Sequence, residues 1–273
     1  MITRLIVGLI LHQKANFIEN PSMGKRVAKR KEQIIALLAS DRHISIPEMS
    51  KILEVSAATI RNDLNDLADR GTIVRTHGGA ISTLPASLMR KQKLMVAEKN
   101  RIGKAAAALV NDGDIIIVET GTTIAQFVKY LLGKRDVRVV TNSLYILSYA
   151  RMNPGIHLTI LGGEFRPTTE TCGGPITQSL LGTFHVQRAF MGTDGFSLEY
   201  GLYADAVDQV EFVKRMNQQA ETTILLADSS KYGKKGFVST VPLMEVDILI
   251  TDTGLPKKIM TQIEEAGIQV MAV

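Results

Sequence analysis

Polar loops follow apolar runs throughout the second part of the chain, and their residue types are suited to binding anions and hydroxyl groups. The first of these loops is Glu119-Thr120-Gly121-Thr122-Thr123. Glycine lets the backbone approach an anion, threonine hydroxyls donate hydrogen bonds, and the amino end of the helix expected from Thr122 adds free amides and a favourable dipole. Alone, Gly-Thr-Thr after a strand is a weak signal, because most such loops are only tight turns before capped helices.

Four further loops supply the other candidate ligand-binding groups. They are Thr141-Asn142-Ser143, Gly162-Gly163, Gly192-Thr193-Asp194-Gly195 and Asp228-Ser229-Ser230-Lys231. From all five loops we expect the ligand to contact Gly121, Thr122, Thr123, Thr141, Asn142, Gly163, Asp194, Gly195 and Lys231. These groups suit a polyhydroxylated phosphate, with Lys231 for the charge and Asp194 or Asn142 for hydroxyls. Simpler roles stay open for two of these loops. Gly162-Gly163 is more typical of a backbone turn than of a ligand contact, and Asp228 is equally suited to cap a helix or a turn.

The elements that must position these loops alternate between strand-like and helical patterns. Apolar runs occur at 115–118, 137–140, 157–161, 189–192, 223–227, 246–250 and 268–272, and helical stretches at 101–110, 122–132, 144–151, 207–219 and 256–266. Such alternation predicts an α/β fold, a doubly wound, mostly parallel sheet. Ligands of such sheets bind beyond the carboxyl ends of the strands, where the polar loops lie.

A different pattern precedes this region. A helical face begins at Val27, and Ser45-Ile46-Pro47-Glu48 forms a capping box with proline in the first turn of a short helix. After a tight turn at 54–55, Ser56 is placed to cap a third helix, which runs to about residue 70 and is ended by Gly71. Two short helices with so brief a turn indicate a helix-turn-helix, and the hairpin expected over 72–80 adds a wing.

The exposed side chains of this module are of kinds that contact DNA. The first turns of a recognition helix reach base edges in the major groove, and a wing touches phosphates. We therefore expect DNA contacts from Ser56, Ala58, Thr59, Arg61, Asn62, Arg75 and His77. Periodicity alone leaves a three-helix protein-interaction module open.

Two sequence motifs favour a DNA-binding module over a protein-interaction module. The run Val55-Ser56-x-x-Thr59-Ile60-Arg61-Asn62-Asp63-Leu64 is followed by Gly71 and by Arg75-Thr76-His77-Gly78-Gly79-Ala80. Both resemble the amino-terminal signature of the DeoR family of bacterial regulators, V-S-x-x-T-I-R-R-D-L, then G and R-x-H-G-G-A. One departure is Asn62, where the family usually has a second arginine. An amide there is able to bond adenine N6 and N7.

The resemblance extends over nearly everything from residue 27 onward. It implies a sensor domain similar to ribose-5-phosphate isomerase, and a repressor of carbohydrate catabolism controlled by a phosphorylated sugar or sugar-derived effector. The alternative is a sugar-phosphate isomerase with an accessory DNA-binding module. The isomerase's second acid and its Lys-Gly-rich loop are missing after Asp194-Gly195, and Glu199 and Glu211 fall in no matching motif. The sequence therefore favours binding without turnover. Glu119 stands where the family commonly has aspartate.

The distribution of charged residues agrees with a protein that binds an anion through the first quarter of its chain. Residues 23–80 hold ten Lys and Arg against seven Asp and Glu, whereas residues 81–273 hold twenty against nineteen. Cys172 is the single cysteine and has no Cys or His neighbours at metal-ligand spacing, so we expect a reducing cytoplasm, no metal and no cofactor. The apolar stretch 5–11 is far short of the ~20 residues that span a bilayer.

The predicted organisation has four parts. Residues 1–22 are an extension, residues 23–80 the winged helix-turn-helix, residues 81–96 a linker, and residues 97–273 the sensor domain. The expected partners are double-stranded operator DNA, the phosphorylated sugar effector and further copies of the chain in a dimer or tetramer, with no membrane.

Overall fold

The computed structural model describes residues 21–41, 44–69, 71–82 and 84–273. Contacts divide the chain into two compact units, with the division between Ala86 and Ser87. The expected amino-terminal extension lies outside the described residues except for Pro21 and Ser22, which begin the first described helix.

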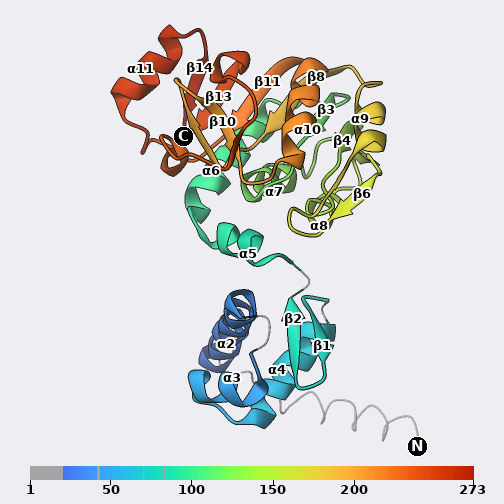
Figure 1. Cartoon of the computed structure of the whole chain (residues 1–273), viewed down its shortest axis with the longest axis vertical. Helices are drawn as coiled ribbons and strands as arrows, with labels where there is room; N and C mark the ends of the chain where they lie inside the picture. The colour runs from blue at the N-terminus through green and yellow to red at the C-terminus, as the bar shows by residue number, and fades with distance from the viewer. Residues whose placement is uncertain (1–20, 42–43, 70, 83) are drawn as a thin grey trace, which may run out of the picture. The chain divides into compact units, whose positions relative to one another are not determined.

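In its described residues the first unit has three helices followed by a hairpin (Figure 1). The helices are α2 (Pro21–Ser40), α3 (Ile46–Leu53) and α4 (Ala57–Asp69), and the antiparallel strands are β1 (Ile73–Thr76) and β2 (Gly79–Ser82). The predicted capping box is present, because the Ser45 amide donates to Glu48 at 2.8 Å and the Glu48 amide donates to the Ser45 hydroxyl at 3.4 Å. The predicted helix-turn-helix and wing are therefore both confirmed.

An apolar core holds these elements together. Ile60, Leu64 and Leu67 of α4 are spaced to share one helix face, and they are buried against Ile34 and Leu38 of α2. Burying each such side chain contributes about 1.5–3 kcal/mol, so this core outweighs the polar contacts that surround it.

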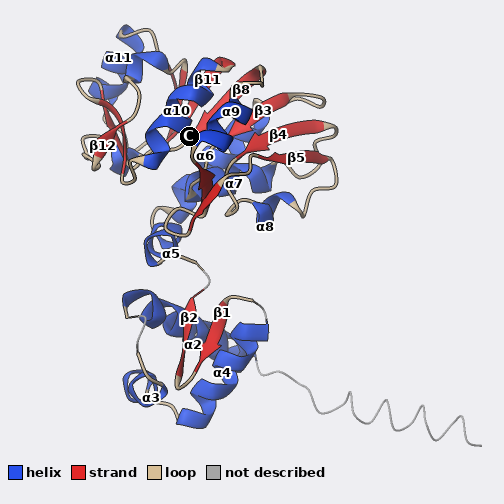
Figure 2. Cartoon of the chain, turned by 45° about the vertical axis from the view of Figure 1, so that its right-hand side comes forward, coloured by secondary structure: helices blue, strands red, loops and turns tan. Residues whose placement is uncertain are grey.

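The second unit is built on one seven-stranded sheet in the order β14-β13-β11-β8-β3-β4-β5 (Figure 2). The strands are β3 (Ile115–Val118), β4 (Val137–Thr141), β5 (Ile156–Ile160), β8 (Val186–Met191), β11 (Ala220–Leu226), β13 (Ile248–Thr251) and β14 (Gln269–Ala272). Every neighbouring pair is parallel. All seven predicted apolar runs thus fall in this sheet.

The strand order makes the sheet doubly wound. From β3 the chain moves outward through β4 to β5, whereas from β8 it moves the other way through β11, β13 and β14. Because parallel crossovers are right-handed, the connecting helices of the two halves fall on opposite faces. The order reverses between β3 and β8, and the loops after these strands flank the crevice where such folds bind ligands.

The remaining elements complete this unit. The helices are α5 (Ala86–Lys93), α6 (Val96–Ala108), α7 (Thr122–Tyr130), α8 (Leu147–Ala150), α9 (Pro175–Leu181), α10 (Asp208–Gln218) and α11 (Lys257–Glu265), with the short helical turns η1 (Ser229–Lys231) and η2 (Leu243–Glu245). Two small antiparallel sheets, not predicted from the sequence, are β6 (Glu164–Arg166) with β7 (Thr171–Gly173), and β9 (Gly195–Ser197), β10 (Gly201–Ala204) and β12 (Val238–Ser239). Their strands are too short for periodicity to reveal.

The segment predicted as a linker, 81–96, differs from the prediction. Its first residues belong to β2, and α5 occupies most of the rest. Leu88 and Met89 of α5 are buried, so this helix packs as part of the second unit. Within the described ranges, no helix is long and apolar enough to cross a membrane.

Candidate functional site

The start of α4 presents the side chains predicted to contact DNA. Ser56, Ala58, Arg61 and Asn62 are exposed and Thr59 is partly exposed. The Thr59 amide donates to the Ser56 hydroxyl at 3.1 Å, which is the predicted helix cap. Arg61 and Asn62 therefore project from a helix turn whose geometry is fixed by its own cap, as reading base edges requires.

An ion pair between α2 and α4 fixes the orientation of this helix. The Arg30 guanidinium donates to both carboxylate oxygens of Asp63, which is 5% exposed. Lys31 also pairs with Asp66 at 2.8 Å. Asp63 lies next to Asn62 in the sequence motif, yet it faces the interior and positions the helix. The motif alone did not distinguish these two roles.

The hairpin provides the predicted wing. Gly78 adopts a φ of +97° in the turn between β1 and β2, a conformation that glycine adopts without strain. His77 is exposed beside it. Arg75 is partly buried, and its Nη1 has no hydrogen-bond partner among the described residues. His77 is thus the more accessible of the two predicted phosphate contacts.

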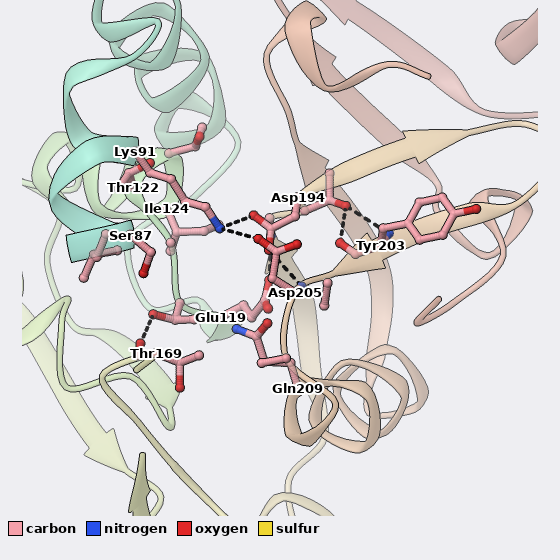
Figure 3. Close-up of a pocket in the computed structure, with 18 of the residues that line it drawn as sticks. Ser87, Lys91, Glu119, Thr122, Ile124, Thr169, Asp194, Tyr203, Asp205 and Gln209 are labelled. Atoms are coloured by element: carbon pink, nitrogen blue, oxygen red, sulfur yellow. Dashed lines mark hydrogen bonds and ion pairs between the residues drawn. The ribbon is translucent and has the colours of Figure 1, made fainter. Parts of the chain in front are cut away.

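A cavity of about 390 Å³ opens at the point where the strand order of the large sheet reverses. It is lined by residues from α5, α6, the loops after β3 and β8, and the segment that leads into α10 (Figure 3). The lining residues are Ser87, Leu88, Lys91, Lys99, 119–124, Thr168, Thr169, 192–194, 203–206, Gln209, Val213, Lys231 and Thr240. Its volume is within the range of small-molecule sites.

Five of the nine predicted ligand contacts line this cavity, namely Gly121, Thr122, Thr123, Asp194 and Lys231. Gly121 has a φ of +135° and immediately precedes α7. The first amides of a helix have no partner within it, so the first turn of α7 brings unpaired donors and the positive end of the helix dipole to the cavity.

The other four predicted contacts lie elsewhere. Thr141 is fully buried and accepts a hydrogen bond from the Ser143 amide. Asn142 donates to the Cys172 carbonyl and borders a second hollow of about 10 Å³, room for no more than one water. Gly163 is packed so closely that a Cβ would lie 2.2 Å from the Thr177 hydroxyl.

Gly195 is the fourth. A Cβ there would lie 2.1 Å from the Lys234 carbonyl oxygen, so its backbone is packed against a neighbouring loop and away from the cavity. These four residues lie at or near strand ends but do not line the cavity, and each bonds to or packs closely against the backbone or side chains of its neighbours.

An ion-pair cluster spans the cavity. The Lys91 ammonium lies 2.5 Å from Asp194 and 3.3 Å from Asp205, and Lys231 lies 3.9 Å from Asp194 (Figure 3). Lys91 was missed because it lies in the segment predicted as a linker. Asp205 follows one of the short, unpredicted strands.

Lys99 is a third ammonium on the cavity wall, and it is only 4% exposed. It donates to the carbonyl oxygens of Lys91 at 2.6 Å and Leu94 at 2.7 Å. Burial lowers the pKa of Lys99 to about 8, so the amine is mostly charged at pH 7. No sequence signal marked Lys99, which occupies an ordinary position near the start of α6.

Glu119 directly follows β3 and is 7% exposed. Its carboxylate accepts a hydrogen bond from the Gly192 amide at 2.7 Å, and burial raises its pKa to about 8. Glu119 is therefore mostly neutral at pH 7. Lys91, Lys99 and Lys231 thus bring three amino groups to the cavity wall beside the carboxylates of Asp194 and Asp205, and this set of groups suits an anion.

The residues considered as catalytic bases do not line this cavity. Glu199 and Glu211 are both exposed. Glu211 lies 4.0 Å from Lys214 on the same helix, the arrangement of a solvated surface pair. Among the described residues no group of three or more His, Cys, Asp or Glu side chains is placed to hold a metal ion.

Two family models match the chain. The model described as the DeoR-like helix-turn-helix domain matches residues 30–85, and the DeoR C terminal sensor domain matches residues 94–253. The helix-turn-helix model covers most of the described part of the first unit, and the sensor-domain model includes nearly all of the residues that line the cavity.

Curated relatives match along most of their length. The putative aga operon transcriptional repressor of Escherichia coli O157:H7 is 30% identical over 252 residues, which cover 90% of this chain and 94% of that protein. The HTH-type transcriptional repressor GlcR of Bacillus subtilis is 34% identical over 232 residues, which cover 82% and 88%.

Among solved structures, ribose 5-phosphate isomerase A from Methanocaldococcus jannaschii is similar with a TM-score of 0.36 and 22% identity, over 49% of this chain and 53% of the isomerase. The match thus spans about half the length of that enzyme, and its TM-score is too low to bear on function. The two family models and the identity with relatives over nearly their whole length show that the chain belongs to the DeoR family of transcriptional regulators.

Proposed function

We propose that the chain represses a carbohydrate catabolism operon, and that a phosphorylated sugar in the cavity lowers its affinity for operator DNA. The observation that supports the ligand class is the cavity itself. An anion is favoured by the three lysine side chains of the wall and by the amino end of α7. Hydroxyl groups of a sugar have the Asp194 and Asp205 carboxylates as acceptors.

The DNA contacts are proposed for the exposed start of α4 and for the wing. Arg61 and Asn62 are placed to contact base edges, with Ser56, Ala58 and Thr59 beside them. His77 and Arg75 would contact phosphates from the wing. Two copies of the chain would place paired recognition helices about 34 Å apart on adjacent half-sites, which is why we propose a homo-oligomer.

Repression is favoured over activation by the names of the relatives, two of which are described as transcriptional repressors. Binding without turnover is favoured by the exposed positions of Glu199 and Glu211 and by the pairing of Asp194 with Lys91. A carboxylate held by an ammonium is a poor general base.

A thermal-shift screen of the full chain tests the ligand class. Ribose 5-phosphate, glucose 6-phosphate, fructose 6-phosphate and other sugar phosphates are compared with the free sugars and with orthophosphate. A ligand at 100 times its Kd adds about 2.7 kcal/mol of stability. We expect stabilisation by at least one sugar phosphate and none by its free sugar. Stabilisation by free sugars alone would contradict the anion site, and turnover of any of the compounds would contradict binding without catalysis.

A further inference from the structure

Helix α5 follows the wing in the chain and contributes to the wall of the ligand cavity. It begins four residues after the wing strand β2 ends, and its residues Ser87, Leu88 and Lys91 form part of the cavity wall. Its exposed residue Lys93 does not line the cavity. The segment that follows the wing therefore reaches the ligand site through one charged side chain, Lys91.

Lys91 is held across the cavity by carboxylates from another part of the unit. Asp194 lies directly before β9 and Asp205 directly after β10, and the Asp205 amide donates to Asp194 at 3.1 Å. The two acids thus form one preset acceptor for the ammonium (Figure 3). The Lys91 side chain is 28% exposed, so an anion entering the cavity can reach it without disrupting the core.

The end of α5 is held from within by a second cavity residue. Lys99 donates to the carbonyl oxygens of Lys91 and Leu94 and is itself buried. Two ammonium groups that line the ligand site therefore add to the packing of Leu88 and Met89 in holding α5. Both ammonium groups therefore lie on the wall of the cavity in which we propose that an anion binds.

We propose that Lys91 binds the effector's anionic group in competition with Asp194 and Asp205. The resulting change in the position of α5 is then passed along the chain to the wing, which precedes this helix in the sequence. This inference rests on the proposed function, since it assigns the regulatory step of the same cavity. A phosphate carries about −1.5 to −2 charge at pH 7, which is comparable to the charge of the two carboxylates together, so it can compete with the pair for the ammonium. The two arrangements of Lys91 supply the differential contacts that coupling between two sites requires.

Two substitutions should act in opposite directions. Lys91→Met removes the ammonium while retaining an unbranched side chain of similar length, so the effector should bind more weakly and lose its effect on DNA. Asp205→Asn removes one competing charge from a side chain that is 62% exposed. This variant should bind the effector more tightly and bind operator more weakly even without it. Lys93→Met removes a neighbouring charge of α5 that faces away from the cavity, and it serves as the matched control.

The experiment uses full-length protein with a fluorescent operator duplex obtained by in vitro selection. The probes are orthophosphate and the sugar phosphates of the thermal-shift screen, with binding measured by calorimetry and operator affinity by anisotropy. For Lys91→Met we expect about tenfold weaker binding of the probe, with operator affinity changing less than about twofold at saturation, against about 5- to 150-fold in the wild type. Lys93→Met should match the wild type.

The outcomes separate the two proposals. A wild type that responds to a sugar phosphate, while Lys91→Met responds equally, would overturn the inference and leave the proposed function intact. Equal losses in Lys91→Met and Lys93→Met would also overturn it, because the effect would then be one of overall charge. A wild type that binds operator but responds to none of the probes would overturn the proposed effector, and the inference with it.

Discussion

Replacing Glu119 with glutamine should change the pH dependence of stability in a way that isolates this one carboxyl group. The carboxyl is buried and accepts a hydrogen bond from Gly192. Glutamine keeps an acceptor oxygen for that bond and does not titrate. The substitution thus removes the ionisation while preserving the shape of the cavity wall.

The magnitude follows from the shift of the Glu119 pKa, from 4.5 to about 8 on burial. Because the folded pKa is raised, the folded protein binds more protons than the unfolded chain between these two values. Its contribution to stability is present in acid and is lost as the pH rises through this window, by up to about 1.4 kcal/mol per pH unit. Between pH 5 and pH 8 the wild type should lose about 3–4 kcal/mol that Glu119→Gln does not lose.

The assay is urea unfolding of wild type and variant at pH 5.0, 6.5 and 8.0, followed by circular dichroism. The stability gained by the variant should be small at pH 5.0 and largest at pH 8.0. Glu211→Gln, at an exposed glutamate of α10, is the control and should differ from wild type by the same small amount at each pH. A gain from Glu119→Gln that does not change with pH would refute the claim that Glu119 is neutral in the folded protein.

Further predictions concern the division of labour between the two units. Arg61→Ala or Asn62→Ala should weaken operator binding in anisotropy titrations by about 1–3 kcal/mol each while leaving effector binding unchanged. Thr122→Ala combined with Lys231→Ala should leave the operator bound but unresponsive to sugar phosphate, and loss of DNA binding in this well-folded variant would contradict the scheme. Asp63→Ala leaves a partly buried guanidinium unpaired and should lower the free energy of unfolding of the first unit by about 1–3 kcal/mol in thermal melts. Operator affinity should fall steeply with salt, because phosphate contacts release counterions, and a flat response would count against the wing.

Much of the fold could be predicted from the sequence because its elements have strong local signals. The capping box at Ser45, the cap at Ser56 and the apolar spacing of Ile60, Leu64 and Leu67 depend on neighbours within a few residues of the chain. The seven parallel strands were found for a related reason: a strand buried on both faces is a continuous apolar run.

The site was predicted less completely, since its geometry depends on contacts distant in sequence. Thr141 ends β4, the strand beside β3, and Asn142 follows it, yet their side chains bond to the backbone of Ser143 and Cys172. Lys91 and Asp205 meet across 114 residues of chain. Lys99 is buried because α6 packs in the interior. No local pattern encodes these three placements.

The central claim is that one chain couples a sugar-phosphate site to operator binding. It is tested most directly by titrating full-length protein onto its selected operator duplex, with each phosphorylated sugar and its free counterpart present at saturation. We expect that at least one phosphorylated sugar lowers operator affinity by about 5- to 150-fold while its free sugar has no effect. Operator affinity that is unchanged by every phosphorylated sugar, or lowered equally by the free sugars, would contradict it.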